Sequence, residues 1–405
     1  MRGFRRVLAY WRAERRTIRQ GFVALVIASL GNLVTGLTLG SITGTLQVLP
    51  GLMVLVPAAI GMRGNIFGAV GSRLGTSIQA GLFEPSWRRD GPLFQNAYSS
   101  AVLSFAISLI LGVLAKTLSV AFGITSISLL DFVVISILGG VFSSVVVGAF
   151  TLALSIQAQR RGWDLDSVAA PLVTAAGDVV TLPALFAATY AIGLSWVTPA
   201  VAGVAITITV VVTLRGFLTD LPATRRVVRE SLLILTLAGG VDIFAGLVIE
   251  SRLQSFVTFP VLLVLIPPFL EDAGALGGIL ASRLASKLHL GVLSPRGRPE
   301  TLAVLDFSII LLFAVWVFAL VGIGADVVAG FIGLQSPGPL TVVGISLLGG
   351  LIATVLGIFV AYYAAVSSFR RGLDPDNHGI PIITSSMDLL GVIALVVAFV
   401  AFGVG

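Results

Sequence analysis

Two aspartates of this chain occupy the same place in two copies of one motif. Asp178 follows Thr174 by four residues, and Asp388 follows Thr384 by the same spacing. A helix puts residues four apart on one face, so each aspartate shares its face with a threonine. Each also leads into an apolar run of membrane-spanning length, where a carboxylate is costly and is by default functional. We expect a cation to lie between the two aspartates.

The two copies of the motif share more than this pair. Each shared residue recurs 210 positions later, without a gap. The first copy holds Arg160-Arg161-Gly162, Asp164, Asp166, Pro171, Thr174 and Asp178, and the second holds Arg370-Arg371-Gly372, Asp374, Asp376, Pro381, Thr384 and Asp388. A duplication of this kind predicts two units of similar structure.

The chemistry of such a pair is that of a hard cation. If the two aspartates meet, an empty site holds two like charges, which one proton or one dication relieves. Mg²⁺ prefers oxygen ligands, keeps several waters and takes one or two carboxylates. Asp178, Asp388, Thr174, Thr384 and helix carbonyls therefore suit a partly hydrated Mg²⁺. In the alternative, each aspartate pairs within its own copy, or is protonated and packs without an ion.

The composition is that of a membrane protein. The chain has 405 residues, of which 57% are hydrophobic and 11% charged, and its mean hydropathy is +1.05. This predicts an all-α polytopic protein in the lipid bilayer, without a separate soluble domain. The net charge of +6 does not indicate nucleic-acid binding, because the arginines lie at the ends of apolar runs, where they set topology. The absence of cysteine excludes disulfides and thiolate metal sites.

About eleven apolar runs are long enough to span a membrane. They fall near 20–40, 46–82, 97–118, 127–158, 167–195, 197–214, 231–249, 256–290, 302–323, 339–368 and 377–405. With the N-terminus in the cytoplasm, nearly all Lys and Arg outside the spans lie on the cytoplasmic side, against only Lys116 and Arg252 outside. We therefore expect an integral protein of the plasma membrane with a cytoplasmic N-terminus.

The duplication extends over the whole chain. Residues 1–195 correspond to 211–405, and 196–210 form the core of a linking transmembrane helix. Five spans in each copy would invert the second copy, and the linking span restores its orientation. We therefore expect two parallel five-helix repeats related by a pseudo-twofold axis along the membrane normal.

Five further polar residues within spans are candidates for lining the path. They are Asn32, Asp242, Asn65, Glu271 and Asp272. Asn32 and its repeat partner Asp242 lie among small residues, where an interhelical hydrogen bond is the alternative. The other three lie in glycine-containing stretches of the second and eighth spans, which permit a broken helix, a strongly tilted one or a helix with an amphipathic extension. There the alternative is a salt bridge from Arg63 to Glu271 or Asp272.

Several charged residues are expected to be peripheral. Arg73 and its repeat partner Arg283 are expected to extend towards the cytoplasmic headgroups. Asp131, Asp306 and Asp326 lack acidic partners in the other repeat and are expected at solvated helix ends. His289 and His378 are expected at the surface.

The motifs resemble those of the MgtE family of magnesium transporters. The resemblance rests on two stretches and on the two aspartate motifs, and it covers essentially the whole chain. The first stretch is Leu55-Val56-Pro57-Ala58 through Gly64-Asn65 to Gly71-Ser72-Arg73-Leu74, and the second is Leu265-Ile266-Pro267-Pro268 through Ala281-Ser282-Arg283-Leu284. The second is similar to the duplicated solute-carrier branch of the family.

The resemblance implies a function and a site. Bacterial members pair two five-span subunits, whose fifth-span aspartates hold a hydrated Mg²⁺ on the axis, and Asp178 and Asp388 would do so within one chain. Carbonyls near the site would include those of Thr174 and Thr384. The cytoplasmic sensor domain of bacterial members is not recognisable here, so regulation by that route is not expected. Ala275 occupies the position of the second repeat that is equivalent to Asn65 of the first, which argues against strict twofold symmetry at this depth of the span.

The sequence thus predicts a transporter or channel for divalent cations, most of all Mg²⁺, and not an enzyme. Two alternatives stay open: a Na⁺- or H⁺-coupled exchanger of another divalent metal, and a membrane metal sensor that does not transport. An intramembrane enzyme would need a paired nucleophile and base, and no such pair stands out. We expect no nucleic-acid ligand, no bound cofactor and no obligate protein partner.

Overall fold

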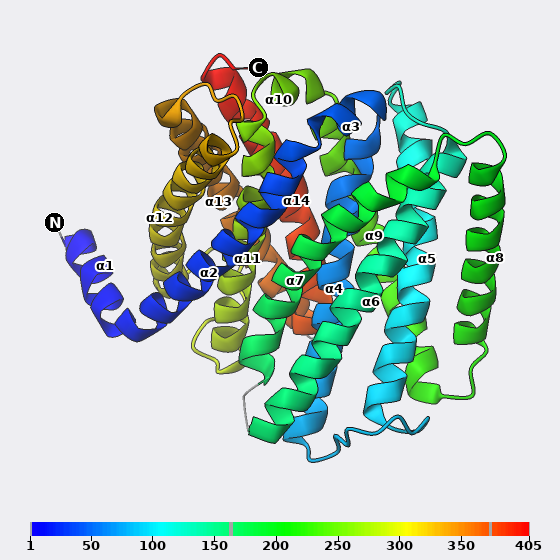
Figure 1. Cartoon of the computed structure of the whole chain (residues 1–405). Helices are drawn as coiled ribbons and strands as arrows, with labels where there is room; N and C mark the ends of the chain where they lie inside the picture. Colours follow the sequence, from blue (N-terminus) through cyan, green and yellow to red (C-terminus); the bar gives the residue numbers. More distant parts are fainter. Residues whose placement is uncertain (1, 162–164, 372–374, 405) are drawn as a thin grey trace. The chain divides into compact units, whose positions relative to one another are not determined.

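The computed structural model describes residues 2–161, 165–371 and 375–404. Within these ranges it also describes the side chains, apart from those of residues 2–4, 17, 79, 165–171 and 375–382. The regular elements of this described part are all helices (Figure 1). The prediction of an all-α protein is therefore confirmed.

Eleven helices of the described part are long and apolar enough to span a membrane, as predicted. They are α2 (Arg15–Ser41), α4 (Leu52–Gln79), α5 (Pro92–Ala121), α6 (Leu129–Arg161), α7 (Leu165–Ala188), α8 (Val197–Phe217), α9 (Pro222–Glu250), α11 (Val261–His289), α12 (Thr301–Phe331), α13 (Pro339–Arg370) and α14 (Pro375–Ala401). The shorter elements are α1 (Arg2–Ala13), α3 (Thr43–Val48), α10 (Leu253–Thr258) and the 3₁₀ turn Thr189–Ala191.

The chain divides into two compact units. Unit 1 consists of residues 1–41 and 252–405, and unit 2 consists of residues 42–251. Unit 1 therefore joins α1 and α2 to α10–α14, and unit 2 contains α3–α9. The helix bounds follow the repeat closely, since α3 (Thr43–Val48) and α10 (Leu253–Thr258) lie 210 residues apart at both ends.

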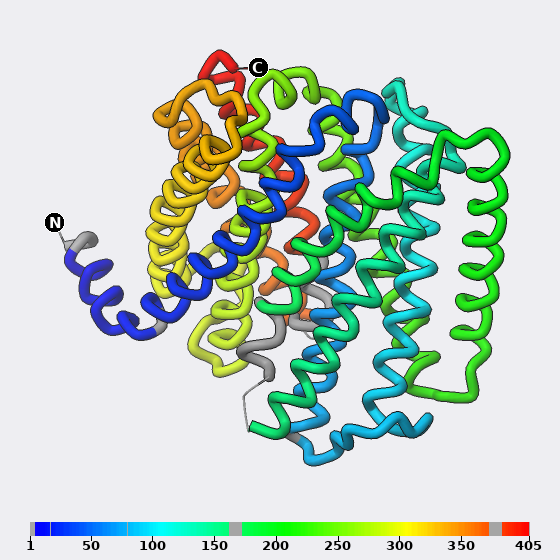
Figure 2. Tube along the Cα trace, in the orientation of Figure 1, coloured from blue at the N-terminus to red at the C-terminus, as the bar shows by residue number. Residues whose placement is uncertain are grey.

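The units do not follow the boundaries of the sequence repeats, because the first long helix of each repeat is exchanged. Helix α2 of the first repeat packs against α11 and α12, and its equivalent α9 packs against α4 and α5. Figure 2 shows α2, in blue, beside α11, in yellow-green, although more than 200 residues separate them. The two units therefore have the same helix arrangement, each with one helix taken from the other repeat.

A central helix organises each unit. In unit 2, α4 contacts α5, α6, α7 and α9, and in unit 1, α11 contacts α2, α12, α13 and α14. In both helices 72% of the most apolar stretch is buried, against 22% in the linking helix α8. Helix α8 packs beside α5 and α6 and leaves apolar side chains such as Val204 and Leu214 exposed. Such a face suits contact with lipid.

Of the alternatives that the sequence left open for the second and eighth spans, a helix broken at its glycines is not found. Helices α4 and α11 run without interruption past Pro57, Pro267 and Pro268. The chain instead turns before each helix, at Gly51 (φ 83°) in unit 2, where a left-handed backbone favours glycine. Within α4, Gly64 serves packing, because a methyl group there would lie 3.2 Å from Thr174 Cγ2.

Two equivalent glycines mark where the exchanged helices meet their new partners. A methyl group on Gly36 of α2 would lie 2.1 Å from the Val264 carbonyl oxygen, and one on Gly246 of α9 would lie 2.3 Å from that of Val54. These contacts are with the backbone, so no side-chain rotation relieves them. Small residues allow this close approach of membrane helices.

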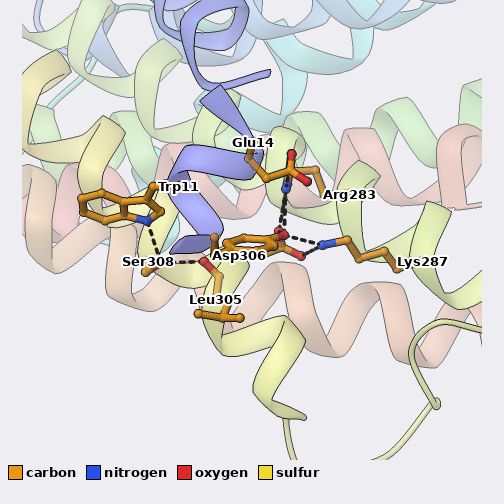
Figure 3. A network of polar contacts seen from close by, with 8 residues as sticks. Trp11, Glu14, Arg283, Lys287, Leu305, Asp306 and Ser308 are labelled. Carbon is orange, nitrogen blue, oxygen red and sulfur yellow. Dashed lines mark hydrogen bonds and ion pairs between the residues drawn. The ribbon is translucent and has the colours of Figure 1, made fainter. Parts of the chain in front are cut away.

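The N-terminal helix α1 is attached to unit 1 by a polar network (Figure 3). Asp306 is fully buried and forms ion pairs with Arg283 at 2.7 Å and Lys287 at 2.5 Å. The Tyr10 hydroxyl donates to Asp306 Oδ1 at 2.8 Å and accepts a hydrogen bond from Lys287 at 2.8 Å. Burial raises the pKa of Tyr10 above its ordinary value. The prediction of a solvated Asp306 is wrong, because the α11–α12 hairpin brings two cations to it.

The first repeat has a weaker version of this cluster. Asn96 stands at the position equivalent to Asp306 and accepts a hydrogen bond from Arg73 Nε at 2.7 Å. Arg73 and Arg283 therefore have partners within their own units. The prediction that they extend towards the headgroups is wrong. Two other residues predicted to be peripheral accept hydrogen bonds from nearby serines: Asp131 from the Ser128 hydroxyl, and Asp326 from the Ser336 hydroxyl at 2.6 Å. His289 is exposed, as expected.

We expect D306N to loosen α1. The change leaves Lys287 and Arg283 without their shared carboxylate, and removing one partner of a buried ion pair costs about 3 kcal/mol. Trypsin should therefore cleave faster at Arg5, Arg6 and Arg12 of α1, and thermal unfolding in detergent should occur at lower temperature. N96D is the matched change in the first repeat and should leave cleavage of α1 unchanged. Equal cleavage rates in D306N and the wild type would show that this carboxylate does not hold α1.

Candidate metal site

Asp178 lies in the interior of unit 2. Its side chain is 3% exposed and belongs to α7, which packs along α4. Two close contacts, each made at a glycine, fix the register of these two helices. Gly64 of α4 faces Thr174 of α7, and a methyl group on Gly177 would lie 3.3 Å from Arg63 Cβ. Glycine on each side of the crossing brings the backbones together beside Asp178.

Asp388 occupies the equivalent place in unit 1, on α14. Gly274 of α11 faces Thr384, as Gly64 faces Thr174, but less tightly, since a methyl group there would lie 4.0 Å from Thr384 Cγ2. A methyl group on Gly277 would lie 3.1 Å from Ile383 Cγ2 and 3.3 Å from Met387 Cγ. Asp388 is half-buried. Each unit therefore presents one aspartate and one threonine of the predicted site at the same helix crossing.

Some residues of the predicted motif lie outside the part whose side chains are described. They are Asp164, Asp166, Pro171, Asp374, Asp376 and Pro381, together with His378. The carboxylates that lead into α7 and α14 therefore stay predictions.

Arg63 is a buried cation beside this crossing. It is 1% exposed, and its guanidinium donates to the Gly140 carbonyl at 2.9 Å and to the hydroxyls of Ser108 and Ser144. These are neutral acceptors in unit 2. They bond the two terminal nitrogens of the guanidinium without neutralising its charge, and Nε is buried with no hydrogen-bond partner among the described residues. Ala273 stands at the equivalent place of the second repeat, so the two crossings differ in charge.

The residues predicted to line the path divide between the two units. Asn32, Glu271 and Asp272 belong to unit 1, and Asn65 and Asp242 belong to unit 2. Asn32, Asp242 and Asp272 are fully buried, whereas Asn65 and Glu271 are half-buried.

One of these side chains has a polar contact that the sequence did not predict. Asp272 lies 2.7 Å from the hydroxyl of Ser29, which belongs to α2. The available signal was the spacing of Ser29 and Asn32, which lie three residues apart and so share one face of α2. Without knowledge of the helix exchange, that face had no assigned partner.

Comparison with known proteins agrees with this duplicated arrangement. The MgtE family model, described as a divalent cation transporter, matches residues 56–188 and again 266–398. Solute carrier family 41 member 3 of Rattus norvegicus is 23% identical over 408 residues, covering 95% of this chain and 87% of the relative. Member 2 of the same family from Gallus gallus is 25% identical over 406 residues, covering 94% and 69%. No solved structure matches the chain.

Proposed function

Because this chain belongs to the MgtE family of divalent cation transporters, we propose that it moves Mg²⁺ across the plasma membrane at a site formed by Asp178 and Asp388. The observation that carries this proposal is the equivalent placement of the two aspartates. Each lies beside the crossing of a central helix with the last helix of its repeat, with a threonine one turn before it. One buried and one half-buried acid repeated in this way suit a shared dication, because neither is then left as an isolated charge.

In this proposal the two repeats are parallel, with bounds 1–195 and 211–405 and a linking helix around 196–210. A pseudo-twofold axis along the membrane normal brings the two aspartates together. Thr174 and Thr384 add oxygen ligands, and the ion keeps part of its hydration shell, as Mg²⁺ does at most protein sites. Asn32, Asp242, Asn65, Glu271 and Asp272 line the approaches, and the N-terminus is cytoplasmic.

The membrane voltage favours one direction of transport. A dication gains about 4.6 kcal/mol per 100 mV when it moves towards a negative interior, which favours uptake. Coupling to Na⁺ or H⁺ is the alternative mechanism, and an aspartate that alternates between metal and proton would supply the coupling step.

The test is flux into liposomes that contain the purified full chain. Under an imposed inside-negative voltage, we expect Mg²⁺ uptake that increases with voltage and needs no Na⁺ or pH gradient. A strict requirement for either gradient would replace the channel mechanism with coupled exchange. Parallel assays with Mn²⁺, Co²⁺ and Ca²⁺ establish selectivity. Mg²⁺ binding without flux of any of these metals would reject transport in favour of a metal sensor.

A further inference from the structure

Asp272 is a buried carboxyl group that the proposed metal site does not use. It is 0% exposed and lies on α11 within unit 1. Its Oδ2 lies 2.7 Å from Ser29 Oγ, and that hydroxyl lies 2.8 Å from the Leu25 carbonyl oxygen one turn earlier in α2. Its other oxygen, Oδ1, is buried and has no hydrogen-bond partner among the described residues.

A count of hydrogens indicates the state of this carboxyl group. Ser29 has one hydroxyl hydrogen, but its oxygen is within hydrogen-bond distance of two acceptors, Asp272 Oδ2 and the Leu25 carbonyl. Two separate hydrogen bonds form at once only if Asp272 carries a proton, because the single hydroxyl hydrogen of Ser29 would otherwise be shared between the two acceptors. Asp272 then donates to Ser29 Oγ, and Ser29 donates to Leu25. An ionised Asp272 would instead be a buried charge with one donor.

The charged groups on the elements around Asp272 do not include a nearby cation in the described part of unit 1. Its neighbour on α11, Glu271, is also acidic and half-buried, and α14 contributes Asp388, a further acid. Arg283 and Lys287 of α11 lie eleven or more residues further along, about 16 Å by helical rise, and are paired with Asp306 of α12.

Helices α2 and α13, which also pack against α11, do not bring a positive charge closer to Asp272. The arginines of α2 lie at its start, and the last of them, Arg19, precedes Ser29 by ten residues, or about 15 Å. Helix α13 holds Tyr362 and Tyr363 and has its basic residue, Arg370, at its far end. A proton is thus the simplest neutralising partner of Asp272.

The first repeat shows that the helix crossing does not need this polar pair. The positions equivalent to Ser29 and Asp272 are Gly239 and Met62, and a methyl group on Gly239 would lie 3.7 Å from Met62 Sδ. At these two positions the crossing in unit 2 is therefore apolar, although Asp242, the equivalent of Asn32, is a buried acid one turn further along α9. A structural role alone does not explain the carboxyl group in unit 1. Asn32, buried one turn beyond Ser29 with both amide atoms unpartnered among the described residues, adds a second polar group on that face of α2.

We propose that Asp272 and Ser29 form a proton-binding site inside unit 1, separate from the Asp178–Asp388 pair. Asp272 holds the proton on Oδ2 in the state described here. When the proton leaves, the Ser29 hydroxyl turns from Leu25 to the Asp272 carboxylate. The site titrates during transport, so flux depends on pH. This last step rests on the proposed function, whereas proton binding itself does not.

Infrared spectroscopy of the purified protein tests proton binding without transport. We expect a carbonyl band of a protonated carboxylic acid at neutral pH that is lost in D272N. The band should persist in E271Q and in M62L, which changes the equivalent position of the first repeat. S29A should keep the band and shift its frequency, which provides a second test if D272N folds poorly. A spectrum without a protonated carboxyl band, or a band unaffected by both D272N and S29A, would overturn the proposal.

Mg²⁺ flux in liposomes tests the link to transport. The proton is bound below the pKa of Asp272 and lost above it, so wild-type flux should change as pH rises from acidic to alkaline. D272N imitates the protonated state and should lose this pH dependence, while M62L should retain it. A D272N variant with the wild-type pH profile would overturn the titration step. Absence of flux in the wild type would reject the proposed function and leave the infrared result standing.

Discussion

Mg²⁺ flux through a D178N/D388N variant is expected to fall at least about a hundredfold. Loss of a group that supports a metal site typically costs 10- to 100-fold in affinity or activity, and here two ionised ligands become neutral. Asparagine keeps the size of aspartate, so the packing of Gly64 on Thr174 and of Gly274 on Thr384 should be retained. Flux into voltage-clamped liposomes measures the loss, and thermal unfolding in detergent verifies the fold.

Single variants separate a shared site from two independent ones. If one ion contacts both carboxylates, D178N and D388N each remove most of the flux, and the double variant is little worse than either. Such non-additivity is typical of residues that act as one unit. D326N is the matched control, since Asp326 is a half-buried acid at a helix end that accepts a bond from Ser336. Flux in the double variant within about twofold of wild type would reject the aspartate pair.

The sequence predicted the helices better than their partners. Length and hydropathy determine whether a run can span a membrane, and all eleven predicted runs are helices. They do not determine which helix packs against which, because lipid and protein are equally apolar surroundings for α2 or α9. The exchange of these two helices was therefore not predicted. Its signal was present in Gly36 and Gly246, which share a repeat position and face backbone oxygens.

The polar residues show a similar division. The repeat placed Asp178 and Asp388 on equivalent helices, and both lie at equivalent crossings, although their meeting stays a prediction. The prediction that Asp306 is solvated was wrong. It rested on the lack of an acidic residue at the equivalent position of the other repeat, whereas the α11–α12 hairpin brings Arg283 and Lys287 to Asp306. Repetition in a sequence thus finds what the two repeats share. It does not find features of one repeat, such as the cluster at Asp306 or the pair of Ser29 and Asp272.

Substituting Gly36 or Gly246 with alanine is expected to destabilise the protein by about 3 kcal/mol, near the upper end for overpacking. The added methyl group would lie 2.1 Å or 2.3 Å from a carbonyl oxygen, so the exchanged helix must move away from its central helix. The carbonyl belongs to the backbone of α11 or α4, the most buried helix of its unit, and cannot yield as a side chain does. Thermal unfolding in detergent measures the effect.

The matched controls are G68A and G278A, an equivalent pair on α4 and α11 with nothing within 4 Å of the added methyl group. Alanine favours a helix over glycine by up to about 1 kcal/mol, so these variants should be as stable as the wild type or more so. All four changes add the same methyl group within a helix, and only the first two close the space between an exchanged helix and its partner. If G36A and G246A unfolded at the same temperature as the controls, close packing at these two points would not hold α2 and α9 in their units. The exchange would then depend on the remaining apolar contacts of each helix.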